Sequence, residues 1–162
     1  MPSKQQSIIL GGLVVAVLST SYLSYINFIC CLGVLSGAIV AVWHYTDTNE
    51  LTISSRDGAV MGLLAGLLGL VVASVLNFAL IKMGIRHDQA ITQFFLNTMG
   101  DSMPPEQYDN MMEKMNAEFT VGLMLKNMAI GAIAYVIFGA IGGVIGAKMF
   151  KKGGDEPTEF ED

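Results

Sequence analysis

The chain has 162 residues, of which 52% are hydrophobic and only 14% are charged, and its formal net charge is −5. Soluble domains carry about 25% charged residues, so this composition favours a protein that meets lipid over much of its surface. Five acidic residues lie within positions 155–162, and acidic and basic residues balance over the rest of the chain. The composition therefore excludes the basic surface that nucleic-acid binding requires.

Three stretches contain no Asp, Glu, Lys or Arg, namely residues 5–46, 58–81 and 127–147. Because an α-helix rises about 1.5 Å per residue, about 20 apolar residues cross a hydrocarbon layer of about 30 Å. The second and third stretches fit one crossing each, whereas the first is roughly twice as long and must turn. We therefore expect an all-α, polytopic membrane protein with four transmembrane helices in a single domain, residues 1–152.

The first span is expected at about residues 5–24, before a Ser- and Tyr-rich segment that allows a turn. The second, at about residues 26–45, ends in Trp43, His44 and Tyr45, which are rings typical of the headgroup level. A basic residue before the first apolar run is also typical of a signal peptide. No Ala-x-Ala-like site follows that run, so we keep the segment as a span.

The third span is expected at about residues 57–83. Ser54 or Ser55 is a plausible N-cap for this helix, and Asp57 in its first turn suits the helix dipole. Asn77 lies within this span and Asn127 within the fourth, and we expect their amides to bond across helices rather than to line a substrate path.

The fourth span is expected at about residues 120–150, continuous with the helix before it. An acidic tail, residues 153–162, follows a Gly-Gly pair and is expected to be disordered. An even number of spans places both termini on one side of the membrane. Lysines cluster at the last membrane exit, so we expect both termini on the cytoplasmic side of a bacterial inner membrane.

An amphipathic insert, residues 85–119, separates spans three and four. Apolar side chains at three- and four-residue steps predict a helix over residues 87–99 that stops at Gly100. Asp101 or Ser102 can cap a second helix that carries an apolar stripe. This stripe is too short, and too charged on its reverse face, to span, so we expect it to lie in the interface or over the bundle end. Its methionines could bind Cu(I) only with a nearby Cys or His, and the insert offers none beside them. The stripe consists of Tyr108, Met111, Met112, Met115 and Phe119.

Glycines at four-residue spacing are the strongest pattern in the chain. This spacing places them on one face of a helix, where a missing side chain lets two backbones approach closely. The pattern leaves open whether these faces pack within one chain, pack between copies or line a pore. The expected packing positions are Gly33, Gly37, Gly58, Gly62, Gly66, Gly139, Gly142, Gly143 and Gly146.

The sequence contains no pattern that indicates catalysis. No ionisable residue lies at the middle of a predicted span, where transporters and proton relays carry one. The two histidines fall on opposite predicted faces of the membrane and could not share a zinc ion. Gly-x-Ser-x-Gly, phosphate-loop and dinucleotide motifs are all missing from the sequence. We therefore expect no enzymatic activity, no cofactor and no metal site.

The order of parts resembles a family of small four-helix bacterial membrane proteins that share a domain of unknown function. The resemblance lies in four features in order: a short first hairpin, a Gly-rich third span opened by Ser-Ser-Arg-Asp-Gly-Ala at 54–59, the amphipathic insert, and a last span ending in Gly-Ala-Lys-Met-Phe-Lys-Lys at 146–152. It implies the four-helix membrane architecture and transfers no activity or site residue.

The leading functional expectation is a non-enzymatic membrane scaffold or accessory subunit that associates through its glycine faces and its amphipathic insert. Its expected partners are the lipid bilayer and either further copies of the chain or a larger membrane complex, with no nucleic acid. The alternatives are a small oligomeric channel or carrier and, more remotely, an intramembrane enzyme.

Overall fold

The computed structural model describes residues 3–20, 31–85, 87–116 and 120–152. Within these residues the chain is helical and contains no strand, so the predicted all-α class is confirmed. The elements are α1 (Gln5–Leu18), α3 (Leu32–Asn49), α4 (Ser55–Lys82), α5 (His87–Met99), a 3₁₀ turn η2 (Gly100–Ser102), α6 (Pro105–Asn116) and α7 (Val121–Met149).

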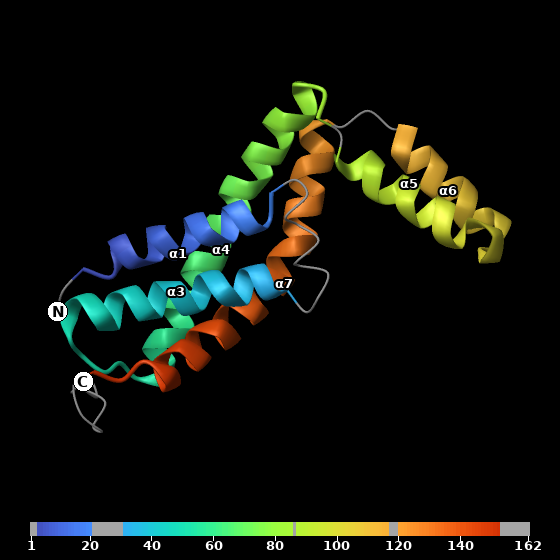
Figure 1. Ribbon diagram of the computed structural model, residues 1–162. Coiled ribbons are helices and arrows are strands. Elements are labelled where there is room, and N and C mark those ends of the chain that lie inside the picture. Colours follow the sequence, from blue (N-terminus) through green and yellow to red (C-terminus); the bar gives the residue numbers. More distant parts are fainter. Residues whose placement is uncertain (1–2, 21–30, 86, 117–119, 153–162) are drawn as a thin grey trace.

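The two longest helices, α4 and α7, lie antiparallel and make the most extensive helix contact in the structure (Figure 1). The shorter helices α1 and α3 form a hairpin that packs on the half of this pair nearest the chain termini. The N-terminus, the α3–α4 connection and the C-terminal end of α7 therefore share one end of the bundle, which we call the terminal end.

Both ends of α4 are fixed by local sequence. Ser54 is the N-cap, and its hydroxyl accepts a hydrogen bond from the Asp57 amide at 3.1 Å, as predicted. At the other end Gly84 adopts φ +90°, which glycine tolerates best. The Ile85 amide donates to the Leu80 carbonyl at 2.9 Å, which completes a Schellman cap.

The prediction of four transmembrane helices is corrected to two. Within the described residues only α4 and α7 are long and apolar enough to cross a membrane. Helix α1 has 14 residues, so it extends about 21 Å and falls short of a hydrocarbon layer of about 30 Å. Helix α3 begins at Leu32 and runs on to Asn49 through a polar last turn that contains Asp47. Residues 21–30, where the predicted first turn falls, lie outside the described part.

Helix α7 begins one residue after the predicted start at about residue 120, but it is not continuous with α6. Thr120 has extended backbone geometry, and its hydroxyl accepts from the Leu123 amide at 3.3 Å, so α7 begins at its own N-cap. The predicted continuity between α6 and the fourth span is therefore wrong, because an N-cap residue interrupts the helical backbone. The acidic tail and Phe119 lie outside the described residues.

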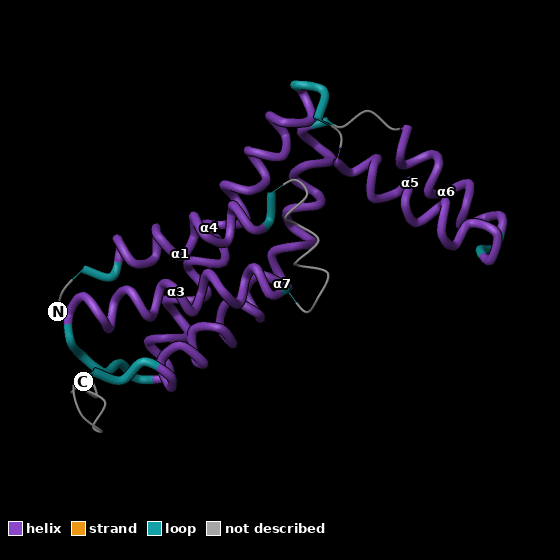
Figure 2. The backbone as a smooth tube through the Cα atoms, viewed as in Figure 1, coloured by secondary structure: helices purple, strands orange, loops and turns teal. Residues whose placement is uncertain are grey.

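The insert folds into a helical hairpin of α5, η2 and α6, which stands away from the bundle (Figures 1 and 2). The bounds of α5 agree with the predicted residues 87–99. Asp101 and Ser102, the predicted caps, lie instead within η2. The Pro104 carbonyl accepts the Gln107 amide at 2.9 Å, so α6 starts at Pro105, where proline is tolerated because this position needs no amide donor.

The core is built largely from small side chains. A cluster of Val42, Tyr45, Ile53, Met61 and Ala147 fills the terminal end. Tyr45 is only 1% exposed, so its ring lies inside the bundle rather than on a surface that faces headgroups. The ring is buried because α3 continues a full turn beyond it and turns that face toward α4 and α7.

Candidate functional site

Glycines of α4 meet the backbone of α7 along the terminal half of both helices. A Cβ atom added to Gly139 would lie 2.7 Å from the carbonyl oxygen of Gly62, closer than side chains approach in folded proteins. The two backbones are therefore in direct contact, which allows dispersion and Cα–H···O contacts along the whole face. The facing pairs are Gly58 with Gly143, Gly62 with Gly139, and Gly66 with the backbone of Tyr135.

The remaining helix contacts use the same close approach. A Cβ atom on Gly11 would lie 2.5 Å from the Gly37 carbonyl oxygen, and one on Gly142 would lie 2.8 Å from the Leu35 carbonyl oxygen. Gly146 packs on α3 as well, and Gly33 is buried within α3. The glycine faces that the spacing pattern left unassigned thus pack helices of a single chain against one another.

The spacing rule missed the contacts that two adjacent glycines of α1 make. Gly11 lies against α3, and the neighbouring Gly12 lies against Leu68 of α4. Gly11 and Gly12 are adjacent, and neither has another glycine four residues away, so the four-residue spacing pattern does not include them. The usable signal was a Gly-Gly pair inside an apolar helix, which lets that helix contact two neighbours at the same level.

Beyond Gly66 the contact between α4 and α7 involves side chains rather than facing backbone atoms. A Cβ atom on Gly131 would lie 3.7 Å from Leu70 Cδ1, which is ordinary van der Waals contact. One further step of four residues along each helix sets Ser74 at the level of Asn127. Here a pocket of about 290 Å³ lies between the two helices and the end of α1. We call it the α4–α7 pocket.

The α4–α7 pocket has an uncharged polar side and an apolar side. None of the described residues that line it is Asp, Glu, Lys, Arg or His. Asn77 Nδ2 donates to the Ser19 carbonyl at 3.3 Å, which confirms the predicted bond of Asn77 to another helix. This bond holds the end of α1 at the pocket, and the Tyr135 side chain lines the same pocket. The polar lining residues are Ser19, Ser74, Asn77, Asn127 and Tyr135.

Two ion pairs lie at the terminal end. Lys4 Nζ lies 2.5 Å from Asp57 Oδ1, and the Ser54 hydroxyl donates to the other carboxylate oxygen of Asp57 at 3.0 Å. Lys152 Nζ lies 2.8 Å from Asp47 Oδ1, a hydrogen bond that raises the pKa of the lysine ammonium. Because each partner is far from the other in sequence, no local pattern predicts these pairs.

His44 also has a partner that the sequence did not indicate. Its Nδ1 atom lies 2.9 Å from the hydroxyl of Ser7, whereas an interfacial position was expected for the ring. Ser7 is only 3% exposed, and the pair joins α1 to α3.

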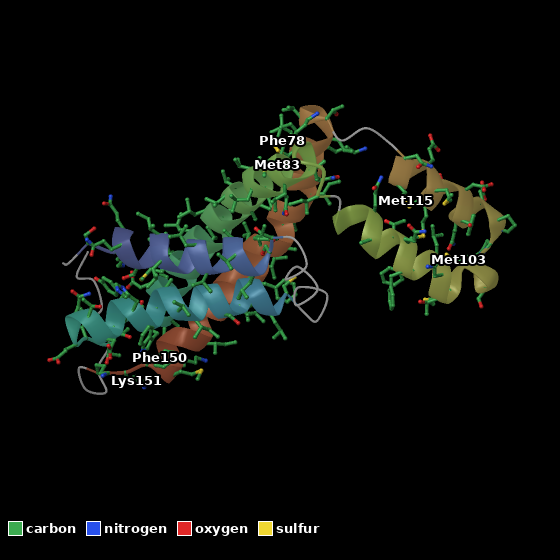
Figure 3. The ribbon with its side chains drawn as sticks, turned by 45° about the horizontal axis from the view of Figure 1, so that its top comes forward. Phe78, Met83, Met103, Met115, Phe150 and Lys151 are labelled. Carbon is green, nitrogen blue, oxygen red and sulfur yellow. The ribbon has the colours of Figure 1, made fainter. Side chains whose placement is uncertain are left out.

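The predicted stripe of the insert lies on the hairpin and does not cover the bundle end. Met111, Met112 and Met115 are half-buried, and a Cβ atom on Gly100 would meet the Tyr108 ring at 3.4 Å. Figure 3 shows Met115 on the hairpin, well away from Phe78 and Met83 at the near end of the bundle and from Phe150 and Lys151 at the terminal end. The expected covering contact is corrected, because α5 and α6 pack mainly on each other among the described residues.

The described residues contain no group of three His, Cys, Asp or Glu side chains that could hold a metal ion. No family model matches the chain, and neither a curated protein nor a solved structure is found to be similar to it. The resemblance to small four-helix bacterial membrane proteins thus remains an expectation. Among the described residues, the fold is that of an all-α protein with two helices long and apolar enough to cross a membrane.

Proposed function

We propose that the chain is an integral membrane protein that acts without catalysis, as a scaffold or accessory subunit of a membrane complex. In this proposal α4 and α7 cross the bilayer, α1 and α3 pack beside their terminal halves, and the α5–α6 hairpin contacts a partner. The observation that carries it is the division of surfaces: the glycine faces are used within the chain, and the hairpin is left outside the bundle.

The exposure of the long helices supports their placement in lipid. A core helix of a soluble protein is mostly buried, but only 39% of the most apolar stretch of α4 and 17% of that of α7 are buried. An exposed apolar surface of this extent is typical of a membrane-facing helix. The outer face of α7 presents Ile130, Ile133, Ile137, Ile141 and Ile145.

The terminal end supports the proposed orientation. It brings together the exposed residues Lys148, Lys151 and Lys152 near the end of α7. Lysines next to a membrane exit favour the cytoplasmic side. We therefore propose that both termini lie on the cytoplasmic side of a bacterial inner membrane and that the hairpin lies on the opposite side.

The hairpin has the surface properties of a protein-binding element. The Phe94 side chain is 61% exposed and that of Met99 is 50% exposed, although both are apolar. The exposed face of α6 carries Glu106, Asp109 and Glu113, which disfavours docking on anionic lipid. A protein surface that covers Phe94 and Met99 is the occupant that fits both features.

Cross-linking in native membranes tests this proposal. Changing Phe94 and Met99 together to Ser should remove the higher-mass cross-linked species, because the exposed apolar contact is lost. The matched control is Gln93→Ser on the same helix, where an exposed polar side chain is replaced. Membrane insertion should be unchanged in both variants. A cross-linked pattern identical to that of the unmodified chain in the Phe94/Met99 variant would exclude the hairpin as the association surface.

A small channel or carrier is the second candidate, and the α4–α7 pocket is the observation that favours it. Against it, residues 58–81 and 127–147 contain no charged side chain that could couple an ion to movement. Solute uptake by proteoliposomes that contain the purified chain would favour this candidate over the scaffold.

A further inference from the structure

The α4–α7 pocket lies at a definite depth if α4 and α7 cross the bilayer, so this inference rests on that part of the proposed function. Ser74 precedes the end of α4 at Lys82 by eight residues, or about 12 Å. Asn127 follows the start of α7 at Val121 by six residues, or about 9 Å. The pocket is therefore below the hairpin-side end of the span, close to where the hydrocarbon layer meets the headgroups.

The lining selects the chemistry of a ligand. Hydroxyl and amide groups come from Ser74, Asn127 and Tyr135, and among the described lining residues no charged side chain can neutralise an ionised ligand. Bringing an unpaired charge into such a site costs several kcal/mol, whereas a carbonyl or hydroxyl oxygen finds hydrogen-bond partners there. Met124 and Met128 add flexible apolar surface next to the polar groups, and such side chains adapt to an alkyl chain.

The size of the pocket limits how much of a lipid can enter. A volume of about 290 Å³ equals that of about ten water molecules. That space holds one compact polar head with the first part of its chain, and the rest of the chain must lie outside along the apolar helix surface. The pocket is too small to enclose a whole diacyl phospholipid.

We propose that the α4–α7 pocket binds the uncharged, oxygen-bearing head of a neutral amphiphile from the membrane, with the apolar chain leaving past Met124 and Met128. A monoacylglycerol and an alkyl-substituted quinone share this chemistry, since both present oxygen acceptors on a compact uncharged head. Ser74, Asn127 and Tyr135 supply the hydrogen-bonding groups, and the bond from Asn77 to the Ser19 carbonyl keeps the α1 side of the pocket in place.

Photo-cross-linking of the full chain in proteoliposomes tests the inference. The probe is a monoacylglycerol with a diazirine in its acyl chain, and the adduct should map to the peptide that contains Met124 and Met128. Unlabelled monoolein or a decyl benzoquinone should compete with the probe. The competitor that acts at the lower concentration identifies which of the two classes of amphiphile the pocket prefers. Palmitate, which is charged, should not compete. Competition by palmitate equal to that of monoolein would overturn the assigned selectivity.

Two glycines of α7 provide a matched pair of variants. A side chain on Gly131 enters the pocket, because its Cβ atom would meet only Leu70 Cδ1 at 3.7 Å. A side chain on Gly122 faces open space, since its nearest neighbour would be the Thr120 hydroxyl at 3.9 Å. Gly131→Leu should abolish the adduct and Gly122→Leu should preserve it. Equal labelling of the two variants would overturn the proposal.

A second, smaller substitution keeps the proposal testable if Gly131→Leu does not fold. Asn127→Ala removes one hydrogen-bonding group without adding bulk, and should weaken monoolein competition about five- to tenfold. Unchanged competition in this variant would overturn the role assigned to Asn127. Membrane fractionation separates this result from the proposed function: a chain that inserts but gives no adduct refutes the pocket alone, whereas a chain that is not extracted with the membranes refutes the embedding of α4 and α7.

Discussion

Replacing Gly62 by Ala tests whether the α4–α7 backbone contact stabilises the bundle. The new Cβ atom would overlap the Gly139 carbonyl oxygen and lie 2.8 Å from both the backbone nitrogen and Cα of Gly143. All three are backbone atoms of a helix and cannot rotate away, so α4 and α7 must separate. Overpacking of this kind costs about 1–3 kcal/mol.

Gly131→Ala is the matched control for this experiment. It adds the same methyl group to a helix in the same pair, but its Cβ atom meets only a flexible leucine methyl at 3.7 Å. Both substitutions gain up to about 1 kcal/mol in helix propensity, and this gain cancels when the two variants are compared. Gly62→Ala should therefore be less stable than Gly131→Ala by about 1–3 kcal/mol.

Unfolding of the purified variants in mild detergent, titrated with SDS and followed by circular dichroism, measures this difference. Gly62→Ala should unfold at a lower SDS fraction than the unmodified chain, and Gly131→Ala at an equal or higher one. Coincident unfolding curves for the two variants would refute the claim that Gly62 is a point of backbone contact. A monomer–dimer shift in Gly62→Ala without loss of helix would instead place this face between copies.

Three further predictions concern the terminal end, a helix cap and the topology. A double-mutant cycle with Lys4→Ala and Asp57→Asn should give a coupling of about 1 kcal/mol in detergent that weakens with salt, because these side chains are only 28% and 16% exposed. The Lys152–Asp47 pair, whose side chains are 52% and 44% exposed, should show no coupling, and equal coupling in the two pairs would contradict this reasoning. Thr120→Ala should cost about 1 kcal/mol in SDS unfolding by removing the α7 cap, and Thr120→Ser should restore it. Reporter fusions at Gly100 and Asp162 should report opposite sides of the membrane, and a cytoplasmic Gly100 would overturn the orientation.

Where the determinants are local, the sequence was a sufficient guide. The bounds of α4, α5 and α7 follow from apolar run length, from Gly84 and Gly100, and from the cap at Ser54. Such features depend on hydrogen bonds between residues three to five positions apart, so a short window of sequence contains all the partners. Charge and apolar content are sums over single residues and need no knowledge of the fold, so they likewise indicated helices that could lie in lipid.

Local sequence failed where a segment was judged by composition alone. Residues 5–46 were long enough for two crossings. Among the described residues, however, α1 is too short to cross, and α3 starts at Leu32 and runs past residue 46 into a polar last turn. An uncharged run shows that a segment can enter lipid. It does not show where each helix starts and stops, because weak capping residues leave that choice to packing against neighbouring helices.

The pairing of surfaces was decided only by the tertiary structure. Spacing identified the faces of Gly62 and Gly139, but their contact depends on the antiparallel register of α4 and α7. The same register sets Ser74 at the level of Asn127, and it creates the α4–α7 pocket where the glycine pairs end. A helix pattern fixes which side chains share a face. Which face meets which depends on the free energy of packing between segments about 50–80 residues apart, and no local pattern contains that information.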